Sequence, residues 1–227
     1  MRRGTMKVGI IGAGHIGGNC ARLIARAGHQ LMLSYSRTPQ RLADLAAELG
    51  GDRVAEVVDV DEAVTRTDLV VLSVPWAQVD DVITRAGSFA GRVVVDTTNQ
   101  FSGSGTVDLG GHTAARVNCD RLTGALYTKS FNTLTAGFQA AAASRPPAER
   151  VVQWLCGQDL DAKDVVAGMI REMGYDPVDL GNVDDCAVME APRRTGAVYG
   201  EEYRRSDAAR VLEALQSGLP IPAPPHY

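Results

Sequence analysis

The stretch KVGIIGAGHIG, residues 7–17, decides the fold class of this chain. Its first half, Lys7 to Ile11, is a short apolar run typical of a buried parallel strand. Its second half spaces three glycines as G-x-G-x-x-G, and apolar residues then recur at helical spacing as far as Gly28. Because a chain with 24 glycines produces such spacings by chance, the triplet alone is a weak indication. Its position between a strand and a helix is what indicates a dinucleotide-binding turn.

Each of the three glycines in this turn has a distinct structural role. Gly12 permits the tight turn, Gly14 lets the backbone approach a pyrophosphate, and Gly17 allows close packing of the helix on the strand. The phosphate charge then faces the free amides and the positive dipole end of the helix. We therefore predict that the cofactor is bound by Gly12, Gly14, His15, Ile16 and Gly17.

Strands and helices alternate along the rest of the chain. Further strands are expected at residues 30–34, 54–58, 68–75, 92–96, 125–131, 151–156 and 176–180, with helical patterns between most of them. This alternation predicts the α/β class, as a Rossmann-like, doubly wound and mostly parallel sheet. We assign residues 1–181 to the nucleotide-binding domain and residues 182–227 to a short helical C-terminal addition with a Pro-rich tail.

The composition excludes several classes of protein. The 227 residues include 45% hydrophobic and 22% charged side chains, and the net charge is 23 − 27 = −4, which argues against nucleic-acid binding and against a polybasic membrane surface. No apolar stretch approaches the ~20 residues of a membrane helix. The four cysteines form no C-x-x-C pair, and no metal-ligand spacing occurs. We expect a soluble, cytoplasmic protein with free thiols and no metal site.

The end of the second strand, which reads SYSRT, selects between the two nicotinamide nucleotides. An NAD site requires an acidic residue there, and this chain has none before Asp44. The hydroxyl groups of Ser34 and Ser36 and the guanidinium of Arg37 instead suit a 2′-phosphate, and Arg41 follows one turn later. We therefore predict NADP(H), with a solvated surface role for Arg37 as the alternative.

These segments, together with four later ones, resemble the family of NADPH-dependent F420 reductases, also called F420-dependent NADP oxidoreductases. The later segments are VPW at 74–76, VDTTN at 95–99, KSFNT at 129–133 and GYDPVDLG at 174–181. The resemblance covers about residues 6–190. It implies a Rossmann-like domain with a short C-terminal addition, in a homo-oligomer that we take to be a homodimer. It also implies hydride transfer between the nicotinamide and coenzyme F420, with the protein mainly stacking two rings.

The resemblance also implies further contacts at the nicotinamide end of the cofactor. Pro75 and Thr135 are expected to flank the nicotinamide, and Asn132 and Thr133 to lie near the second ring. The complete set of cofactor contacts implied at this end is Val74, Pro75, Thr98, Asn99 and Thr135. No catalytic residue is identified, and Lys129 and Asn132 are the candidates.

The chain departs from the family after about Cys186, where the segments MEAPRR (189–194) and EEYRR (201–205) replace an apolar helix. Arg193 and Arg194 either grip an anionic tail or belong to a solvated face. Two alternatives to the F420 reaction therefore stay open. One is NADPH-dependent reduction of a small carbonyl or imine, with Lys129 or Tyr127 as proton donor, and the other is a non-catalytic NADPH-binding sensor. The second substrate, the direction of hydride transfer and the role of the charged segment do not follow from the sequence.

Overall fold

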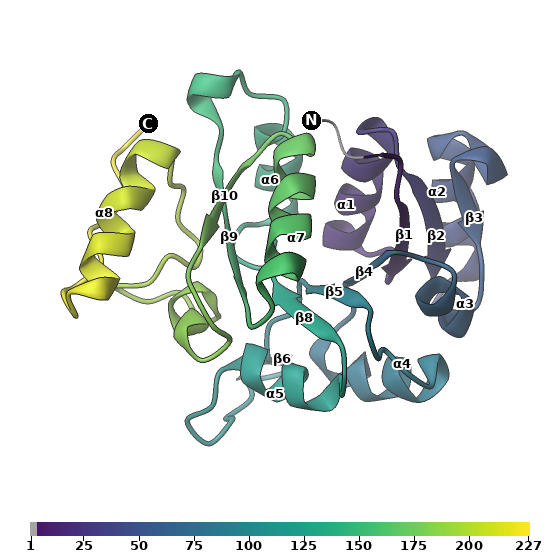
Figure 1. Ribbon diagram of the computed structural model, residues 1–227, viewed down its shortest axis with the longest axis horizontal. Coiled ribbons are helices and arrows are strands. Elements are labelled where there is room, and N and C mark those ends of the chain that lie inside the picture. Colours follow the sequence, from purple (N-terminus) through teal and green to yellow (C-terminus); the bar gives the residue numbers. More distant parts are fainter. Residues whose placement is uncertain (1–3) are drawn as a thin grey trace.

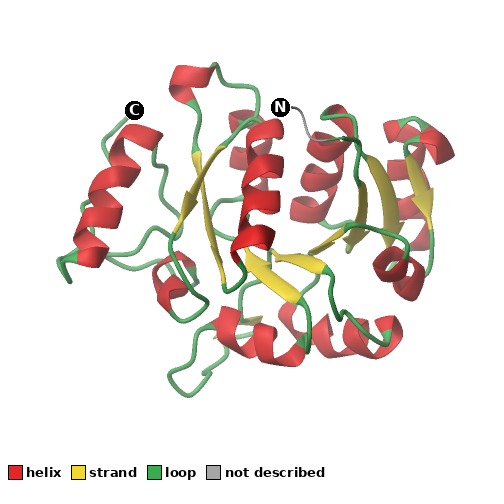
Figure 2. Ribbon diagram, viewed as in Figure 1, coloured by secondary structure: helices red, strands yellow, loops and turns green. Residues whose placement is uncertain are grey.

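An eight-stranded sheet forms the middle layer of the computed structural model, which describes residues 4–227 (Figures 1 and 2). The strand order is β10-β9-β8-β5-β4-β1-β2-β3, and all neighbours are parallel except β8 and β9. The strands are β1 (Lys7–Ile11), β2 (Gln30–Ser34), β3 (Ala55–Val57), β4 (Leu69–Leu72), β5 (Val93–Asp96), β8 (Leu126–Lys129), β9 (Val152–Gly157) and β10 (Asp176–Asp179). The predicted Rossmann-like, mostly parallel sheet is thereby confirmed.

Helices cover both faces of this sheet because successive side chains of each buried strand point to opposite faces. Val8 and Ile10 pack in one apolar cluster, whereas Ile11 packs in the other. The first cluster includes residues of α1 (His15–Arg26), α2 (Pro39–Leu49), α6 (Ala136–Ala142) and α7 (Leu160–Glu172). The second includes residues of α3 (Val60–Thr65), α4 (Val79–Ala86), α5 (Ala114–Arg121) and α8 (Arg205–Gln216).

The residues after β10 continue the second helical layer. Cys186 in the 3₁₀ turn η4 (Asp185–Met189) and Val211 in α8 are fully buried in the same cluster as Trp154 of β9. The rings of Trp154 and Tyr203 meet edge to face with centroids 5.6 Å apart. Residues 182–227 therefore share one core with the sheet.

The Pro-rich tail lies along this layer. Residues 219–227 form neither helix nor strand, as the prolines predict, yet Ile221 is buried. The Tyr203 hydroxyl donates a hydrogen bond to the Pro222 carbonyl oxygen over 2.8 Å. The tail is thus extended and packed against the domain.

Several elements differ from the sequence prediction. The strand expected at 68–75 ends at Leu72, and the chain then turns through Pro75 into the 3₁₀ turn η2 (Trp76–Gln78). The connection between β5 and β8 contains α5 and a small hairpin that was not expected, β6 (Phe101–Ser102) and β7 (Gly105–Thr106). Two further short turns are η1 (Gly51–Arg53) and η3 (Pro147–Glu149). None of the helices in residues 4–227 has both the length and the apolar character needed to span a bilayer.

Candidate functional site

The turn between β1 and α1 leaves no room for side chains at two of its glycines. Gly12 has a φ of 101°, and a Cβ atom there would lie 2.2 Å from the Ser73 carbonyl oxygen. A Cβ atom on Gly17 would lie 1.9 Å from the Gly12 carbonyl oxygen. Both glycines are therefore required by the close packing of the turn itself, which agrees with the tasks predicted for them.

Gly14 has a different environment, because a Cβ atom on it would meet nothing within 4 Å. It is the N-cap of α1 and carries no capping side chain, and the first turn of α1 contains no acidic residue. Gly18 makes the first helical hydrogen bond, to the Gly14 carbonyl oxygen at 2.8 Å, so the amides before it lack intrahelical acceptors. Open space beside free amides and a positive helix end fits the pyrophosphate of a dinucleotide.

A cavity of about 440 Å³ begins at this turn and follows the carboxyl ends of β4, β5 and β8. Ligands of doubly wound sheets bind in this position, where the strand order reverses beside β1. Its walls include eight residues predicted from the sequence, namely Gly14, His15, Ile16, Val74, Pro75, Thr98, Asn99 and Thr135, together with the candidate Asn132. The remaining lining residues are Ser73, Trp76, Thr97, Phe101, Phe131, Leu134, Ala136 and Tyr199.

A second hollow, of about 950 Å³, lies at the ends of β2 and β3. It is lined by Ser34, Ser36 and Arg37, so the structure brings together the three residues predicted to select the nucleotide. The Arg37 side chain is exposed. Asp59 and Asp61 line the same hollow from the start of α3, a contribution that the sequence pattern at the end of β2 did not reveal.

Tyr35 forms one wall of this second hollow. Its hydroxyl lies 2.7 Å from an Asp81 carboxylate oxygen, and the Arg85 guanidinium lies 5.7 Å from the ring centroid. Burial, together with the hydrogen bond to Asp81, raises the pKa of Tyr35 to about 12, so the hydroxyl remains protonated. The ring is therefore held across the space between β2 and α4.

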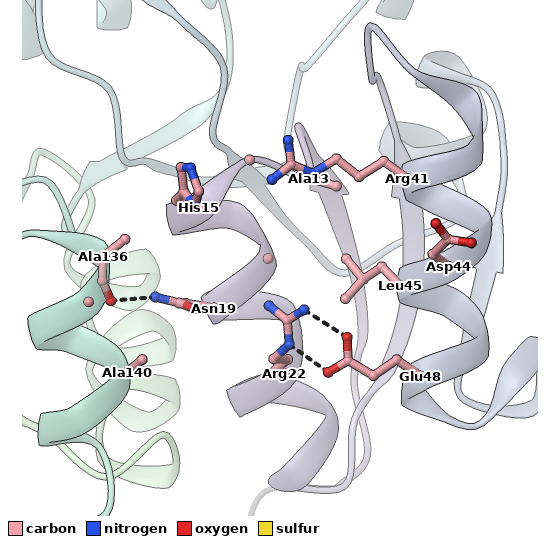
Figure 3. Close-up of a pocket in the computed structure, with 13 residues that line it drawn as sticks. Ala13, His15, Asn19, Arg22, Arg41, Asp44, Leu45, Glu48, Ala136 and Ala140 are labelled. Carbon is pink, nitrogen blue, oxygen red and sulfur yellow. Dashed lines mark hydrogen bonds and ion pairs between the residues drawn. The ribbon is translucent and has the colours of Figure 1, made fainter.

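A third, smaller hollow of about 360 Å³ lies between α1, α2 and α6 (Figure 3). Arg22 and Glu48 face each other across it with two contacts of 2.7 Å, so their charges are mutually compensated. Arg41 extends from α2 toward Ala13 at the β1–α1 turn (Figure 3), and it has no ion-pair partner among residues 4–227. Arg41 therefore offers an uncompensated positive charge near the phosphate turn, in a hollow that shares Gly14, His15 and Ala136 with the 440 Å³ cavity.

Asn99 and Asn132 form the floor of the 440 Å³ cavity and bind each other. The Asn132 amide nitrogen donates to Asn99 Oδ1 at 3.1 Å and to the Met189 carbonyl oxygen at 2.7 Å, and the Asn99 amide nitrogen donates to the Asn132 carbonyl oxygen at 2.9 Å. The preceding residue, Phe131, is buried with a φ of 59°, a conformation that non-glycine residues adopt only where the surroundings enforce it. The loop after β8 is thus held in one conformation.

Lys129 and Tyr127, the proposed proton donors, lie beneath this floor and do not border the cavity. The Lys129 ammonium has no exposed surface; it contacts the Thr98 carbonyl oxygen at 2.6 Å and Asp96 Oδ2 at 3.4 Å. Tyr127 donates to the same Asp96 oxygen at 2.6 Å. In this geometry Lys129 holds the loop that carries Thr98 and cannot reach a substrate, so the structure does not support it as a catalytic group.

The protonation of this buried group follows from its neighbours. Burial lowers the pKa of Lys129, but the carboxylates of Asp96 and Glu190 more than offset this effect and keep the pKa above its ordinary value. Burial raises the pKa of Tyr127 well above its ordinary value. Both groups are therefore held in their protonated forms as a fixed support beneath the cavity.

Charged side chains of the segment after Cys186 form hydrogen bonds and ion pairs with other residues of the protein. Glu190 is buried and accepts hydrogen bonds from the amides of Ala114 and Ala115, each at 2.7 Å, at the N-terminus of α5. Arg194 donates to the carbonyl oxygens of Glu190 at 2.9 Å and Pro192 at 3.1 Å. Arg193 pairs with Glu201 at 2.6 Å.

Two lining residues were not foreseen from the sequence. Phe101 reaches the cavity from the β6 end of the hairpin, and Tyr199 reaches it from the C-terminal segment. The amide of Gly200 donates to the Thr133 carbonyl oxygen at 2.8 Å and so holds this segment against the loop after β8. Contacts between segments so far apart in the sequence have no local pattern.

Comparison with known proteins supports the predicted resemblance. Residues 7–100 match the family described as NADP oxidoreductase, coenzyme F420-dependent. The match covers the phosphate turn, the SYSRT segment and the ends of β4 and β5, whereas the two later segments quoted for the resemblance lie beyond it. Residues 7–100 therefore have the nucleotide-binding fold of an NADP-dependent oxidoreductase family.

Similar proteins cover most of the chain. Metalloreductase STEAP3 of Rattus norvegicus is 27% identical over 185 residues, which are 82% of this chain and 36% of that protein. The chain thus spans about a third of the length of this curated relative. Among solved structures, the hypothetical protein SMa0349 of Sinorhizobium meliloti is 28% identical, with a TM-score of 0.77 over 88% of this chain and 96% of that one.

A structure from Arthrobacter sp. FB24, named by inference as an F420-dependent NADP reductase, has a TM-score of 0.67 and 20% identity over 80% of this chain and 87% of that one. At this identity the likeness shows a shared fold. It extends over the region after residue 100 that the family match does not reach.

The glycines of the turn yield a paired prediction. Gly17→Ala is expected to lower the free energy of unfolding by about 1–3 kcal/mol, because its Cβ collides with backbone. Gly14→Ala is expected to leave stability within about 0.5 kcal/mol of the wild type but to weaken dinucleotide binding at least tenfold, since its methyl group occupies the open space. Urea denaturation and nucleotide titration measure the two effects. Equal nucleotide affinity in Gly14→Ala would contradict the placement of the pyrophosphate.

The buried ion pair yields a second prediction. Lys129→Met is expected to cost about 3–5 kcal/mol of unfolding free energy, because it leaves the Asp96 carboxylate buried without its positive partner. Lys7→Met, at an exposed position, is the matched control and should change stability by less than about 0.5 kcal/mol. Urea denaturation, monitored by circular dichroism, compares the stabilities of the two variants. A Lys129→Met protein as stable as the control would refute the role of Lys129 as a buried structural partner of Asp96.

Proposed function

We propose that this chain is an NADP(H)-dependent oxidoreductase that transfers hydride between the nicotinamide and coenzyme F420. The observation that carries the proposal is the order of its hollows along the sheet edge. The phosphate turn of α1 stands between the hollow lined by Ser36 and Arg37 and the cavity lined by Val74 and Pro75. An extended dinucleotide requires three sites in this spatial order: a hollow for the 2′-phosphate, a turn for the pyrophosphate and a cavity for the nicotinamide.

The choice of NADP(H) rests on the hollow at the end of β2. Ser34, Ser36 and Arg37 offer two hydroxyl groups and a guanidinium, and no acidic residue stands at the end of β2. Arg37 is exposed and Arg41 lacks an ion-pair partner within residues 4–227, so both guanidinium groups are free to bind phosphate. The acidic side chains of Asp59 and Asp61 line the same hollow, from the start of α3.

The acceptor cavity suits the transfer of hydride between two rings. When bound, NADPH supplies the hydride, and the protein positions the reactants and excludes water. Val74 and Pro75 form an apolar wall, and the linked amides of Asn99 and Asn132 form a rigid floor. His15 and Tyr199 are the cavity's titratable side chains, and its walls contain no Lys, Arg, Asp or Glu. A flat, neutral ring such as the reacting end of a deazaflavin fits these surroundings.

A second candidate function is reduction of a small carbonyl or imine by the same bound nucleotide. This reaction needs a proton donor beside the acceptor. Tyr199, which lines the cavity, favours it, whereas the donors first considered, Lys129 and Tyr127, are buried and do not line the cavity. If the protein binds NADPH but reduces no acceptor, this result would instead favour the third alternative, a non-catalytic NADPH-binding sensor.

The nucleotide preference gives a direct test. The wild type is expected to bind NADPH at least tenfold more tightly than NADH, and Arg37→Ala is expected to weaken NADPH binding about 10- to 100-fold while sparing NADH. Arg53→Ala, an exposed arginine in η1, is the matched control and should change neither affinity. Fluorescence titration with both nucleotides measures these affinities. Equal affinities of the wild type for NADPH and NADH would contradict the NADP(H) assignment.

The reaction itself is tested by mixing the protein with NADPH and F420 and following the absorbance of the deazaflavin. We expect F420 to be reduced with one NADPH oxidised per F420, because the acceptor cavity adjoins the nucleotide site. Tight NADPH binding without F420 turnover would contradict the F420 reaction. A cyclic imine, pyrroline, tested in the same assay, then decides whether the second candidate function replaces it.

A further inference from the structure

Tyr199 is the ionisable side chain on the acceptor half of the cavity. His15, the other ionisable lining residue, begins α1 at the phosphate turn and also lines the smaller hollow between α1, α2 and α6. Tyr199 belongs instead to the C-terminal segment, and its neighbour Gly200 is hydrogen-bonded to Thr133 in the loop after β8. Tyr199 therefore lines the same cavity as Asn132, and its backbone is tied to the residue that follows Asn132.

Hydrogen bonds anchor the backbone on both sides of Tyr199. The amides of Val198 and Tyr199 donate to the Val188 carbonyl oxygen at 2.8 and 3.2 Å, and the amide of Gly200 donates to the Thr133 carbonyl oxygen at 2.8 Å. Three consecutive amides are thus anchored to two different segments. The position from which the Tyr199 side chain extends is therefore fixed before a substrate arrives, which is what a reacting group requires of its support.

Several other polar groups on the wall have protein partners, whereas Asn132 Oδ1 is buried without one among residues 4–227. Thr97 Oγ1 donates to Ser73 Oγ at 3.0 Å, Thr98 Oγ1 accepts from Asn118 at 3.1 Å, and Asn99 and Asn132 bind each other. The Tyr199 hydroxyl makes no hydrogen bond to any residue between 4 and 227. Burial raises the pKa of Tyr199, so its phenol is protonated at neutral pH and can donate.

We propose that the Tyr199 hydroxyl donates a hydrogen bond, and then its proton, to the acceptor atom that becomes negative during hydride transfer. The proposal rests on the proposed function and names a catalytic residue for it. A C–H bond forms on the acceptor as NADPH is oxidised to NADP⁺. The O–H bond of Tyr199 breaks, an N–H bond forms on the ring nitrogen of F420, and the electron pair of the O–H bond stays on the tyrosinate. Water at the mouth of the cavity returns the proton.

The test compares Tyr199→Phe with a matched control. Tyr199→Phe keeps the ring and removes the hydroxyl, and Tyr227→Phe removes a hydroxyl that contacts Asp207 in the C-terminal segment, away from the cavity. Both variants are expected to bind NADPH as the wild type does. Tyr199→Phe loaded with NADP⁺ is expected to bind F420 about three- to tenfold more weakly, as expected for one lost hydrogen bond. Its single-turnover hydride transfer is expected to be at least about 100-fold slower.

Each outcome decides the proposal. Transfer by Tyr199→Phe within twofold of the wild type overturns the role of Tyr199 and leaves the proposed function intact. Loss of NADPH binding in Tyr199→Phe also overturns it, because the ring then serves the nucleotide. A wild type that binds NADPH but reduces neither F420 nor pyrroline overturns both the proposed function and this role. Reduction of pyrroline alone, slowed in Tyr199→Phe, supports the role with an imine nitrogen as the atom that receives the proton.

Discussion

The close approach of α1 to the end of β1 is the constraint on which the rest of this structure depends. The helix begins so near the strand that a Cβ atom on Gly17 would lie 1.9 Å from the Gly12 carbonyl oxygen. The segment after β4 comes equally close, since a Cβ atom on Gly12 would lie 2.2 Å from the Ser73 carbonyl oxygen. This packing directs the free amides at the start of α1 toward the sheet edge. The two larger hollows then fall on either side of the turn, one at the end of β2 and one at the ends of β4, β5 and β8. The positions of the two hollows, which we propose receive the two halves of a dinucleotide, thus depend on backbone contacts at this turn.

A second level of organisation lies beneath the acceptor cavity. Asp96 and Lys129 face each other across β5 and β8, and the Lys129 ammonium reaches the carbonyl oxygen of Thr98. Charged groups of this kind are stable in a core only when they are paired and hydrogen-bonded. The pair therefore fixes the strand ends from which Thr98 and Asn99 enter the cavity wall. Met189 adds a contact from the C-terminal segment to the same floor.

The nucleotide half of the site could be predicted from the sequence because its determinants are local. The strand before the glycines, the spacing of Gly12, Gly14 and Gly17, and the SYSRT segment each lie within a few residues, and the structure assembles them at one edge of the sheet. Val74, Pro75, Thr98 and Asn99, predicted as cofactor contacts, lie together on the cavity wall, since strands of a parallel sheet end at a common edge.

The acceptor half could not be predicted in the same way. Lys129 ends a strand and carries a reactive amine, which made it a candidate, but its ammonium is buried and is paired with Asp96 of another strand. Phe101 and Tyr199 reach the cavity through a hairpin and a late loop with no periodic pattern. The antiparallel pairing of β9 with β8 likewise depends on tertiary contacts, and it brings the C-terminal segment to the same end of the sheet.

The backbone contacts that close the phosphate turn all come from the first 100 residues of the chain. Met189 and Tyr199, in contrast, lie near its end. On the ribosome, the backbone partners of the phosphate turn are therefore synthesised well before Met189 and Tyr199, so a nascent chain contains everything that shapes this turn before it contains the C-terminal part of the cavity wall.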